Sequence, residues 1–381
     1  MKSNFDILGN HIRLIDTRNR ESITDRVLGI NIDKFFMPSV ANVIGTDLSK
    51  YKLITKGKFA CNPMHVGRDE RLPVALYDEE EPAIVSPAYF MFEVIDNSIL
   101  NEDYLMMWFR RPEFDRICWL HTDGSVRGGI TWDDICRLEL PIPPIEKQLE
   151  IVNSYKAITE RIALKQKIND NLEATLNTVF VKMYEETDED SSVLLSELCS
   201  LASSKRVFAE DYVSDGVPFY RGKEITQKRN GEPISDPLFI SHNHFASLKA
   251  NYGIPVCGDI LITAVGTIGN SYFVQDEEFY FKDGNIIWLK DFIEPSLNYY
   301  IYDYMQTPIF KRQLEGICIG STQTALTIVA LSNLKVKKPR TAELALYCKK
   351  SKALRSAIQT NNGEIERLTQ VAKAMLASLS R

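Results

Sequence analysis

Two short stretches of the sequence carry residue types that could do chemistry. In "SHNHF", residues 241–245, His242 and His244 could ligate a metal ion, but no Cys or acidic residue has a suitable spacing to complete such a site. In "AVGTIGN", residues 264–270, the glycines could bring backbone N–H groups around a phosphate. Glycine more often supplies a tight turn between strands. We therefore interpret the first stretch as an exposed polar loop and the second as a turn.

The motifs of common enzyme classes are missing from the sequence. It contains no G-x-x-x-x-G-K-[ST] phosphate loop, no G-x-S-x-G elbow and no H-E-x-x-H metal helix. An adenine methyltransferase would carry a cofactor glycine loop and an Asn-Pro-Pro-aromatic motif, and "NPM" at 62–64 is the nearest match. The sequence therefore predicts a chain with no catalytic residues, no metal site and no cofactor of its own.

The composition is that of an ordinary globular protein. The chain has 381 residues, of which 44% are hydrophobic and 25% charged, and this length suits two or three domains. It has no apolar run of about 18 residues and no secretory signal pattern, so we expect a cytoplasmic protein. The seven cysteines lie far apart without a C-x-x-C pair, which is typical of small buried hydrophobic residues.

The net charge of -6 at first disfavours nucleic acid, because phosphate contacts require Lys and Arg. Many of the acids are clustered, however, in "DEEE" at 78–81, "EETDED" at 185–190 and "QDEEF" at 275–279. Basic stretches remain elsewhere, so the net charge neither supports nor excludes DNA as a ligand.

The segments that must position any site occur twice in the chain. "GSVRGGITWDDICRLELPIP", residues 124–143, aligns without a gap with "GSTQTALTIVALSNLKVKKP", residues 320–339. The same offset pairs Tyr104, Pro112, Phe114 and Arg116 with Tyr300, Pro308, Phe310 and Arg312. Further upstream, "YKLITKGKFACN" (51–62) resembles "YGIPVCGDILIT" (252–263), and "ILGNHIRL" (7–14) resembles "LLSELCSL" (194–201). The pattern indicates a tandem duplication of a whole unit, since solenoid repeats are far shorter.

Each copy begins with strand-like runs, such as "DILITAV" and "NIIWLK", broken by turn signals that include "DGN" at 283–285. A helical stretch follows, at about 101–118 and about 296–314, and then a proline element, "PIPP" or "KKP", that suits the start of a helix. We expect an α+β protein with four parts: a mixed domain at 1–144, a helix at 145–187, a second mixed domain at 188–340 and a helix at 341–381.

Both expected helices carry a heptad seam, with apolar residues at alternating steps of four and three. The seam of each helix is interrupted near its midpoint, at Lys165 and Asn169 in the first copy and at Asn361 in the second. We predict that the helices, each about 60 Å long at 1.5 Å per residue, pair antiparallel about a pseudo-two-fold axis, with Lys165 and Asn361 near it fixing the register. The alternative is that each helix packs on its nearest domain. The predicted pairing residues are Ile158, Ile162, Lys165, Leu172, Leu176, Leu354, Ile358, Asn361, Leu368 and Met375.

Two similar domains held apart by a rigid spacer suit a ligand that is itself linear and repeating. DNA fits best, because a fixed separation between two reading heads corresponds to a half-site spacing. The segments "GDILITAVGTIGN", "GNIIWL" and "GSTQTALTIVALSNLKVKKP" of the second copy, and "LELPIPPIEKQLEIV" of the first, resemble the specificity subunits of type I restriction-modification enzymes. The resemblance covers essentially the whole chain, in the order recognition domain, helix, recognition domain, helix.

This resemblance implies a non-catalytic subunit that binds a bipartite sequence in double-stranded DNA, each domain reading one half. The helices would set the gap and dock two modification subunits, which carry S-adenosylmethionine and methylate adenine at N6. Restriction subunits, with ATP and Mg, would complete a translocating nuclease. The second copy departs from the family pattern, because "KKPRTAELALYCKK" replaces the usual Pro-Pro and Glu-Gln start of the helix. The first copy has "ACNPMHVGRDERLPV" in place of the glycine turn.

Base reading needs paired donors and acceptors, as in Arg to guanine or Gln to adenine. The candidate loops are "DGSVRGG", with Ser125 and Arg127, and the aligned "GSTQT", with Ser321, Thr322, Gln323 and Thr324. Arg127 aligns with Gln323, so equivalent positions would read different bases; the alternative is a turn that only leads into the next element. Other basic residues could hold phosphates or be solvated surface charges: Arg18, Arg20, Arg68, Arg71, Lys205, Arg206, Arg221 and Lys223.

Two other functions stay open on sequence grounds. The duplicated domains could bind protein, which would make the chain a non-catalytic assembly scaffold, and the acidic balance favours this slightly. A free-standing enzyme is disfavoured by the missing motifs. A scaffold predicts no enriched DNA sequence and no steep salt dependence of DNA binding.

Overall fold

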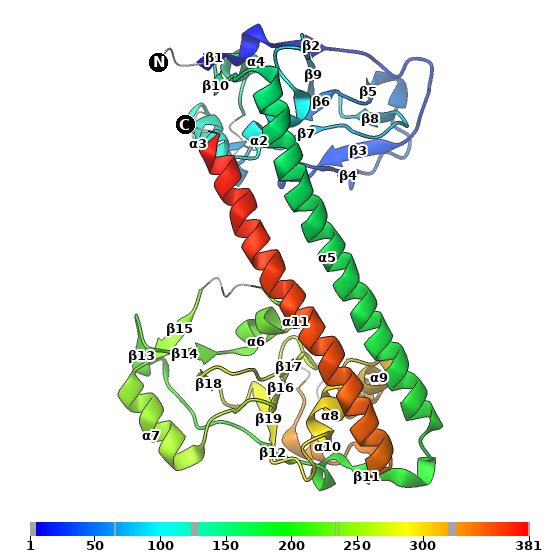
Figure 1. Cartoon of the computed structure of the whole chain (residues 1–381), viewed down its shortest axis with the longest axis vertical. Coiled ribbons are helices and arrows are strands. Elements are labelled where there is room, and N and C mark those ends of the chain that lie inside the picture. Colours follow the sequence, from blue (N-terminus) through cyan, green and yellow to red (C-terminus); the bar gives the residue numbers. More distant parts are fainter. Residues whose placement is uncertain are drawn as a thin grey trace. The chain divides into compact units, whose positions relative to one another are not determined.

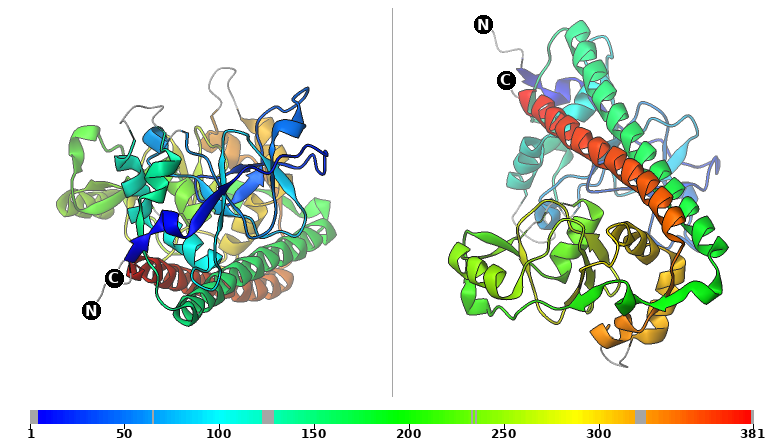
Figure 2. Two further views of the ribbon diagram at one scale, coloured as in Figure 1. Left: turned by 90° about the horizontal axis from the view of Figure 1, so that it is seen from above. Right: turned by 60° about the horizontal axis from the view of Figure 1, so that its bottom comes forward.

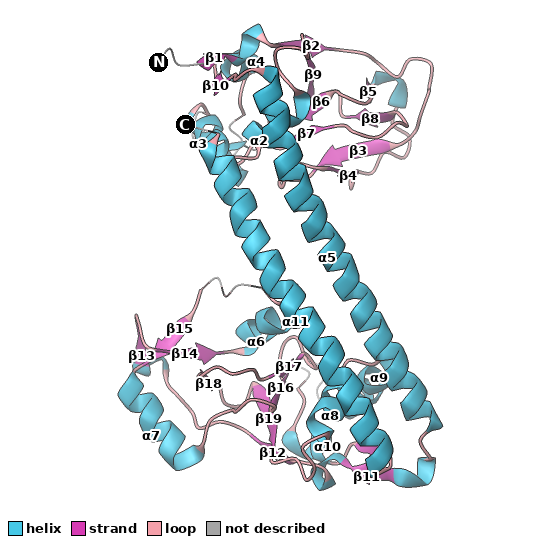
Figure 3. Cartoon of the chain, in the orientation of Figure 1, coloured by secondary structure: helices cyan, strands magenta, loops and turns pink. Residues whose placement is uncertain are grey.

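The computed structural model describes residues 5–64, 66–122, 129–232, 234, 236–318 and 325–379. The chain divides into two compact units (Figure 1). Unit 1 comprises Met1–Gln166 and Gly363–Arg381, and unit 2 comprises Lys167–Asn362. Each unit combines small sheets with helices (Figure 3).

Unit 1 contains two four-stranded sheets and one two-stranded sheet. The first sheet has the antiparallel order β2-β9-β6-β7, and the second has the order β4-β3-β8-β5, in which β3 and β8 run parallel. Strand β1 pairs with β10. The strands are β1 (Phe5–Ile7), β2 (Ile12–Ile15), β3 (Val27–Ile30), β4 (Phe36–Pro38), β5 (Lys52–Ile54), β6 (Phe59–Cys61), β7 (Val74–Leu76), β8 (Ala83–Val85), β9 (Phe90–Val94) and β10 (Glu139–Pro141).

The helices of unit 1 lie between and after the strands, and several share a core with the first sheet. They are α1 (Val66–Asp69), α2 (Glu102–Phe109), α3 (Pro112–Leu120), α4 (Trp132–Cys136), the first part of α5 (Ile145–Glu186), and the 3-10 turns η1 (Leu8–Asn10) and η2 (Leu48–Lys50). The end of α11 (Thr341–Ser378) also belongs to this unit.

Unit 2 repeats this plan. Its sheets have the orders β12-β19-β16-β17 and β13-β15-β14-β18, and β11 pairs with β20. The strands are β11 (Ser192–Leu194), β12 (Ser200–Ala202), β13 (Tyr212–Val213), β14 (Val217–Tyr220), β15 (Leu238–Ile240), β16 (Ile260–Thr263), β17 (Ser271–Phe273), β18 (Tyr280–Phe281), β19 (Ile286–Lys290) and β20 (Lys335–Lys337). The helices are α6 (Gly222–Asn230), α7 (His242–Tyr252), α8 (Leu297–Met305), α9 (Pro308–Ile317), α10 (Ile328–Ser332), and the 3-10 turns η3 (Glu189–Ser191), η4 (Leu195–Glu197) and η5 (Ala209–Asp211).

The predicted α+β fold with a duplicated unit is confirmed, and the repeat extends to individual hydrogen bonds. The strand order β2-β9-β6-β7 of unit 1 recurs as β12-β19-β16-β17 in unit 2. The hydroxyl of Tyr104 donates to the carbonyl of Pro141 at 3.2 Å, and that of the aligned Tyr300 donates to Lys337 at 2.5 Å. Each expected helical stretch, however, is two helices, because Pro112 and the aligned Pro308 stand at the first turn of a new helix and lack the N–H that would continue the old one.

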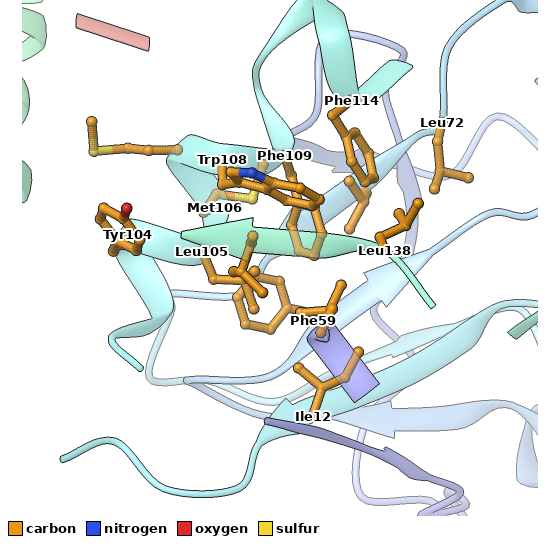
Figure 4. Packing of buried hydrophobic residues seen from close by; sticks show 14 of the residues in the cluster. Ile12, Phe59, Leu72, Tyr104, Leu105, Met106, Trp108, Phe109, Phe114 and Leu138 are labelled. Atoms are coloured by element: carbon orange, nitrogen blue, oxygen red, sulfur yellow. The ribbon is translucent and has the colours of Figure 1, made fainter. Parts of the chain in front are cut away.

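An aromatic cluster fills the core of unit 1 (Figure 4). The rings of Phe59 and Phe109 lie edge to face with centroids 5.8 Å apart, and Phe109 lies 4.9 Å from Phe114. Each such side chain contributes about 1.5–3 kcal/mol on full burial. The cluster joins β6, α2 and α3, so it fixes the helix that leads into the first candidate loop.

Helices α5 and α11 pair antiparallel in each unit (Figure 2). In unit 1, Val152 and Tyr155 of α5 share a core with Ala372 and Leu376 of α11, and Lys165 forms an ion pair with Glu364 at 2.8 Å. The pairing in unit 2 continues the same direction, since the later part of α5 meets the earlier part of α11: Phe180 lies 5.8 Å from Tyr347 between ring centroids.

The polar residues of the heptad seams form hydrogen bonds with each other across α5 and α11. Asn361 donates to Asn169 Oδ1 at 2.8 Å, and Asn169 donates to Asn362 Oδ1 at 2.7 Å. The predicted pairing residues are all buried or half-buried: Ile158, Ile162, Lys165, Leu172, Leu176, Leu354, Ile358, Asn361, Leu368 and Met375. Several of them also pack on the core of their own unit, so the two interpretations of the heptad seam both apply.

Candidate nucleic-acid interface

Each unit anchors the end of its candidate loop beside the same strand connection. In unit 1 the chain leaves the loop at Ile130, whose N–H donates to the carbonyl of Pro63 at 3.2 Å. Pro63 starts the connection between β6 and β7. In unit 2 the aligned Leu326 donates to Ala264 at 2.9 Å, at the start of the turn between β16 and β17. The fold therefore places the residue that follows each candidate loop beside an equivalent strand connection in each unit.

The predicted base-reading residues all fall outside the described part of the chain. Residues 123–128 and 319–324 are not described, and they include Ser125, Arg127, Ser321, Thr322, Gln323 and Thr324. Arg68 belongs to α1, and its side chain is likewise outside the described residues. What the structure gives for these loops is the position of their ends.

The β6–β7 connection in unit 1 is supported by a buried ion pair. Lys34, 4% exposed, places its Nζ 2.7 Å from Asp115 Oδ1 and donates to the carbonyl of Phe109 at 2.5 Å. Burial lowers the pKa of Lys34, and Asp115 opposes that shift. Asp115 also accepts from the N–H of Leu72 at 3.1 Å, which ties the connection to α3.

Arg71 lies next to this support and pairs with Asp33 at 3.0 Å. It lines an open groove together with Arg110, Arg116 and Trp119. None of these last three was among the predicted contact residues. Arg116 had appeared only as an aligned position, and nothing in the local sequence marks Arg110 or Trp119, since the groove forms from segments far apart in the chain.

The equivalent connection in unit 2 is a glycine turn, as predicted. Gly266 and Gly269 have φ of +77° and +90°, in the left-handed region that favours glycine. Neighbouring polar side chains hold the turn, because Thr267 shares a hydrogen bond of 3.2 Å with Thr226, and Asn270 accepts from Arg229 at 2.8 Å. The turn thus occupies, beside its candidate loop, the place that α1 takes in unit 1.

Two of the other predicted basic residues are engaged inside their own unit. Arg18 donates to the carbonyl of Lys50 at 2.7 Å and pairs with Asp16. Arg221 pairs with the buried Glu224 at 2.6 Å. Burial acts to raise the pKa of Glu224, but hydrogen bonds from Arg221 outweigh it and hold the pKa below its ordinary value. Arg18 and Arg221 therefore both make contacts within their own unit.

The remaining basic candidates are on the surface. Arg206 pairs with Asp283 at 2.9 Å, and the Lys205 ammonium lies 5.5 Å from the centre of the Tyr252 ring. Arg20 and Lys223 are exposed, and neither forms an ion pair within the described residues. Of the basic candidates whose side chains the structure describes, these two are exposed and have no intramolecular ion pair that would compete with a phosphate.

Gln148, from the "EKQLE" segment, is fully buried at the start of α5. It donates to the carbonyls of Ile99 and Pro143 at 2.8 and 2.7 Å and accepts from the N–H of Asn101 at 2.9 Å. Leu344 replaces it in the second copy and is also fully buried. The second copy thus departs from the family pattern in how its helix docks on its own unit: a buried apolar side chain replaces the hydrogen-bonded glutamine.

The comparisons with known proteins agree with this arrangement. Residues 189–370 match the family described as the type I restriction modification DNA specificity domain. The strand order of the first sheet in the matched part recurs in unit 1, and the resemblance to type I specificity subunits inferred from sequence motifs is confirmed.

Two curated relatives of the specificity family align with the chain. A Haemophilus influenzae protein named as a type I restriction enzyme specificity subunit, S.HindORF215P, is 30% identical over 225 residues. The alignment covers 57% of this chain and 55% of that protein, little more than half of its length. A Methanocaldococcus jannaschii protein named as the MjaX specificity subunit is 22% identical over 98% of this chain and 87% of its own.

Solved structures support the fold. The S subunit of a type I restriction-modification system from M. genitalium superimposes with a TM-score of 0.58 at 14% identity, covering 99% of this chain and 96% of that one. A chain from a type I system, solved to explain complex assembly and conformational transition, gives a TM-score of 0.51 at 16% identity and covers 99% and 97% of the two chains.

The described residues contain neither a membrane-spanning helix nor a metal-ligand cluster. None of the helices there is long and apolar enough to span a membrane. No three His, Cys, Asp or Glu side chains in that part of the chain gather as a metal site would need. The predicted loop at 241–245 is wrong, because His242 and His244 stand in the first turn of α7, where the N–H of His244 donates to the capping Ser241.

Proposed function

We propose that the chain is the sequence-specific DNA-binding subunit of a type I restriction-modification complex, with no catalytic activity of its own. Each unit contributes one recognition domain, corresponding to residues 1–144 and 188–340, and each domain reads one half of a bipartite target. The helices α5 and α11 set the gap between the half-sites and dock two modification subunits. S-adenosylmethionine belongs to those partners, and ATP with Mg belongs to restriction subunits.

One observation carries this proposal: the duplicated anchor of the candidate loops. The bonds Ile130 to Pro63 and Leu326 to Ala264 are the same bond made twice, so the two loops end at equivalent anchors. Their sequences differ where base reading would need them to differ, with Arg127 against Gln323. Equivalent anchors with different contact residues are what two heads that read different half-sites require.

The test is selection of bound DNA from a random duplex library, using the full chain with its modification subunits at two salt concentrations. The proposal predicts an enriched motif of two short blocks separated by unread base pairs, together with a steep fall of affinity with salt. An assembly scaffold, which the net charge of -6 slightly favours, predicts no enriched sequence.

A further inference from the structure

The internal repeat allows the roles of identical residues to be compared within one chain. Between residues 104–143 and 300–339, the positions that are identical in both copies and described in both units are Tyr104/Tyr300, Pro112/Pro308, Phe114/Phe310, Arg116/Arg312, Thr131/Thr327, Leu138/Leu334 and Pro143/Pro339. A residue that stays the same in both copies, while most of its neighbours have changed, must serve something that both copies share.

All but one of these pairs have a structural task. The tyrosines bond to a strand carbonyl, and the phenylalanines and leucines are buried. Thr131 and Thr327 cap α4 and α10 by accepting from Asp134 and Ala330. The prolines begin helices or stand just before them.

The arginine pair has no such task. Arg116 has a side chain 66% exposed and approaches Glu113 only at 4.0 Å, and Glu113 is replaced by Ile309 in the second copy. Arg312 is exposed and makes no ion pair or hydrogen bond with the described residues. Neither stands in the last turn of its helix, where a cation would stabilise the helix dipole. The chain itself therefore does not explain why arginine is kept.

The place of the pair points to the ligand. Arg116 lies one helical turn before the end of α3 at Leu120, and the candidate loop follows at residue 123. Arg312 has the same place on α9, ahead of the loop at 319. Phosphate contacts position a protein on DNA without reading its sequence, whereas base contacts must change with the target. An arginine common to both heads, beside loops that differ, fits the first kind.

We propose that Arg116 and Arg312 each hold a DNA backbone phosphate beside the base-reading loop of their own unit, as a sequence-independent clamp used twice. This inference rests on the proposed function, because it needs DNA at the loops. It adds two contact residues and gives the two parts of each unit different roles. The helix arginine binds the DNA backbone, and the loop selects the base.

The experiment compares Arg116→Ala, Arg312→Ala and the double variant in the full chain with its modification subunits. We expect each single change to weaken binding about three- to tenfold for target and random duplexes alike, to reduce the slope of log affinity against log salt by about 1, and to leave the selected motif unchanged. Arg116→Lys and Arg312→Lys should restore most of the affinity, since Lys also holds phosphates.

Arg137→Ala is the matched control, because Arg137 is 74% exposed and is replaced by Asn333 in the second copy. It should leave affinity and salt slope unchanged. Wild-type affinity and slope in both alanine variants, at unchanged thermal stability, would overturn the clamp, and so would a changed base in the selected motif. If the wild-type complex selects no DNA at all, both the proposed function and the clamp are refuted. Unchanged binding by the variants of a DNA-selecting complex refutes the clamp alone.

Discussion

Asp303 provides the sharpest test of how α11 is fixed on unit 2. Its side chain is 3% exposed, at the end of α8, and its carboxylate accepts from the hydroxyls of Tyr347 at 2.5 Å and Ser351 at 2.9 Å. It also forms an ion pair with Arg355, whose guanidinium stacks 4.6 Å from the centre of the Tyr302 ring. Three side chains of α11 thus depend on one carboxylate.

Asp303→Asn keeps the shape of this side chain and removes its charge. Breaking a buried ion pair by removing one partner costs about 3–5 kcal/mol, because the other charge is left uncompensated. The Arg355 side chain is 26% exposed and so keeps some hydration, which places the expected loss near the lower end, at about 3 kcal/mol.

The matched control is Asp103→Asn in unit 1. Asp103 of α2 pairs with Lys156 of α5 at 2.6 Å, and the two side chains are 39% and 49% exposed. A surface pair of this kind contributes about 0–1 kcal/mol. Urea unfolding gives the stability change, and hydrogen exchange shows whether α8 and the first half of α11 lose protection together. A loss from Asp303→Asn no larger than that from Asp103→Asn would refute the reasoning.

Three further changes test other parts of the account. Asn169→Leu should destabilise the chain by about 1–3 kcal/mol in urea unfolding, because it removes the acceptor of the buried Asn361 amide. The double variant Asn169→Leu with Asn361→Leu should recover the loss. Equal stability of the single and the double variant would contradict this. Gly269→Ala should cost about 1–3 kcal/mol, since φ is +90° and the added Cβ would lie 2.5 Å from Leu314, while Gly316→Ala in α9, which meets nothing within 4 Å, should raise the melting temperature slightly. Gln148→Ala should cost about 2–4 kcal/mol, because three backbone groups lose a buried partner, and a melting temperature as in the wild type would show that these bonds are dispensable.

The duplication is the part of the fold that the sequence predicts best. Aligned residues such as Thr131 and Thr327 cap equivalent helices, and α5 and α11 begin at aligned positions, Ile145 and Thr341. Local signals suffice there, since caps, prolines and heptads act over a few residues.

The strand order and the polar contacts were harder to predict, because they join distant segments. The sequence around Lys34 does not predict its ion pair with Asp115. The second copy likewise does not predict that Asp303, which aligns with Met107, contacts three residues of α11. The heptad seam predicted polar residues at the helix midpoints, with Lys165 and Asn361 as the residues that fix the register. Asn361 donates to Asn169, one turn from Lys165, and Lys165 pairs with Glu364, so both polar positions of α5 have partners on α11.

The candidate site was predictable in position more than in detail. Both loops follow from the repeat, and the bonds at Ile130 and Leu326 place their ends. Exposure alone separates Arg20 and Lys223 from Arg221, which looks the same in sequence but is held by the buried Glu224. That distinction depends on folding, since Glu224 becomes buried only when α6 packs on the sheet.

The central claim is that two similar units each read one half of a divided DNA target. Methylome sequencing of cells carrying the chain and its modification subunits, before and after the 124–129 loop is replaced by the loop of a related chain, tests it most directly. The account predicts a split motif methylated on adenine, in which the exchange alters one half and leaves the other half and the gap unchanged. An undivided motif, or a split motif that the exchange leaves intact or alters in both halves, would contradict it.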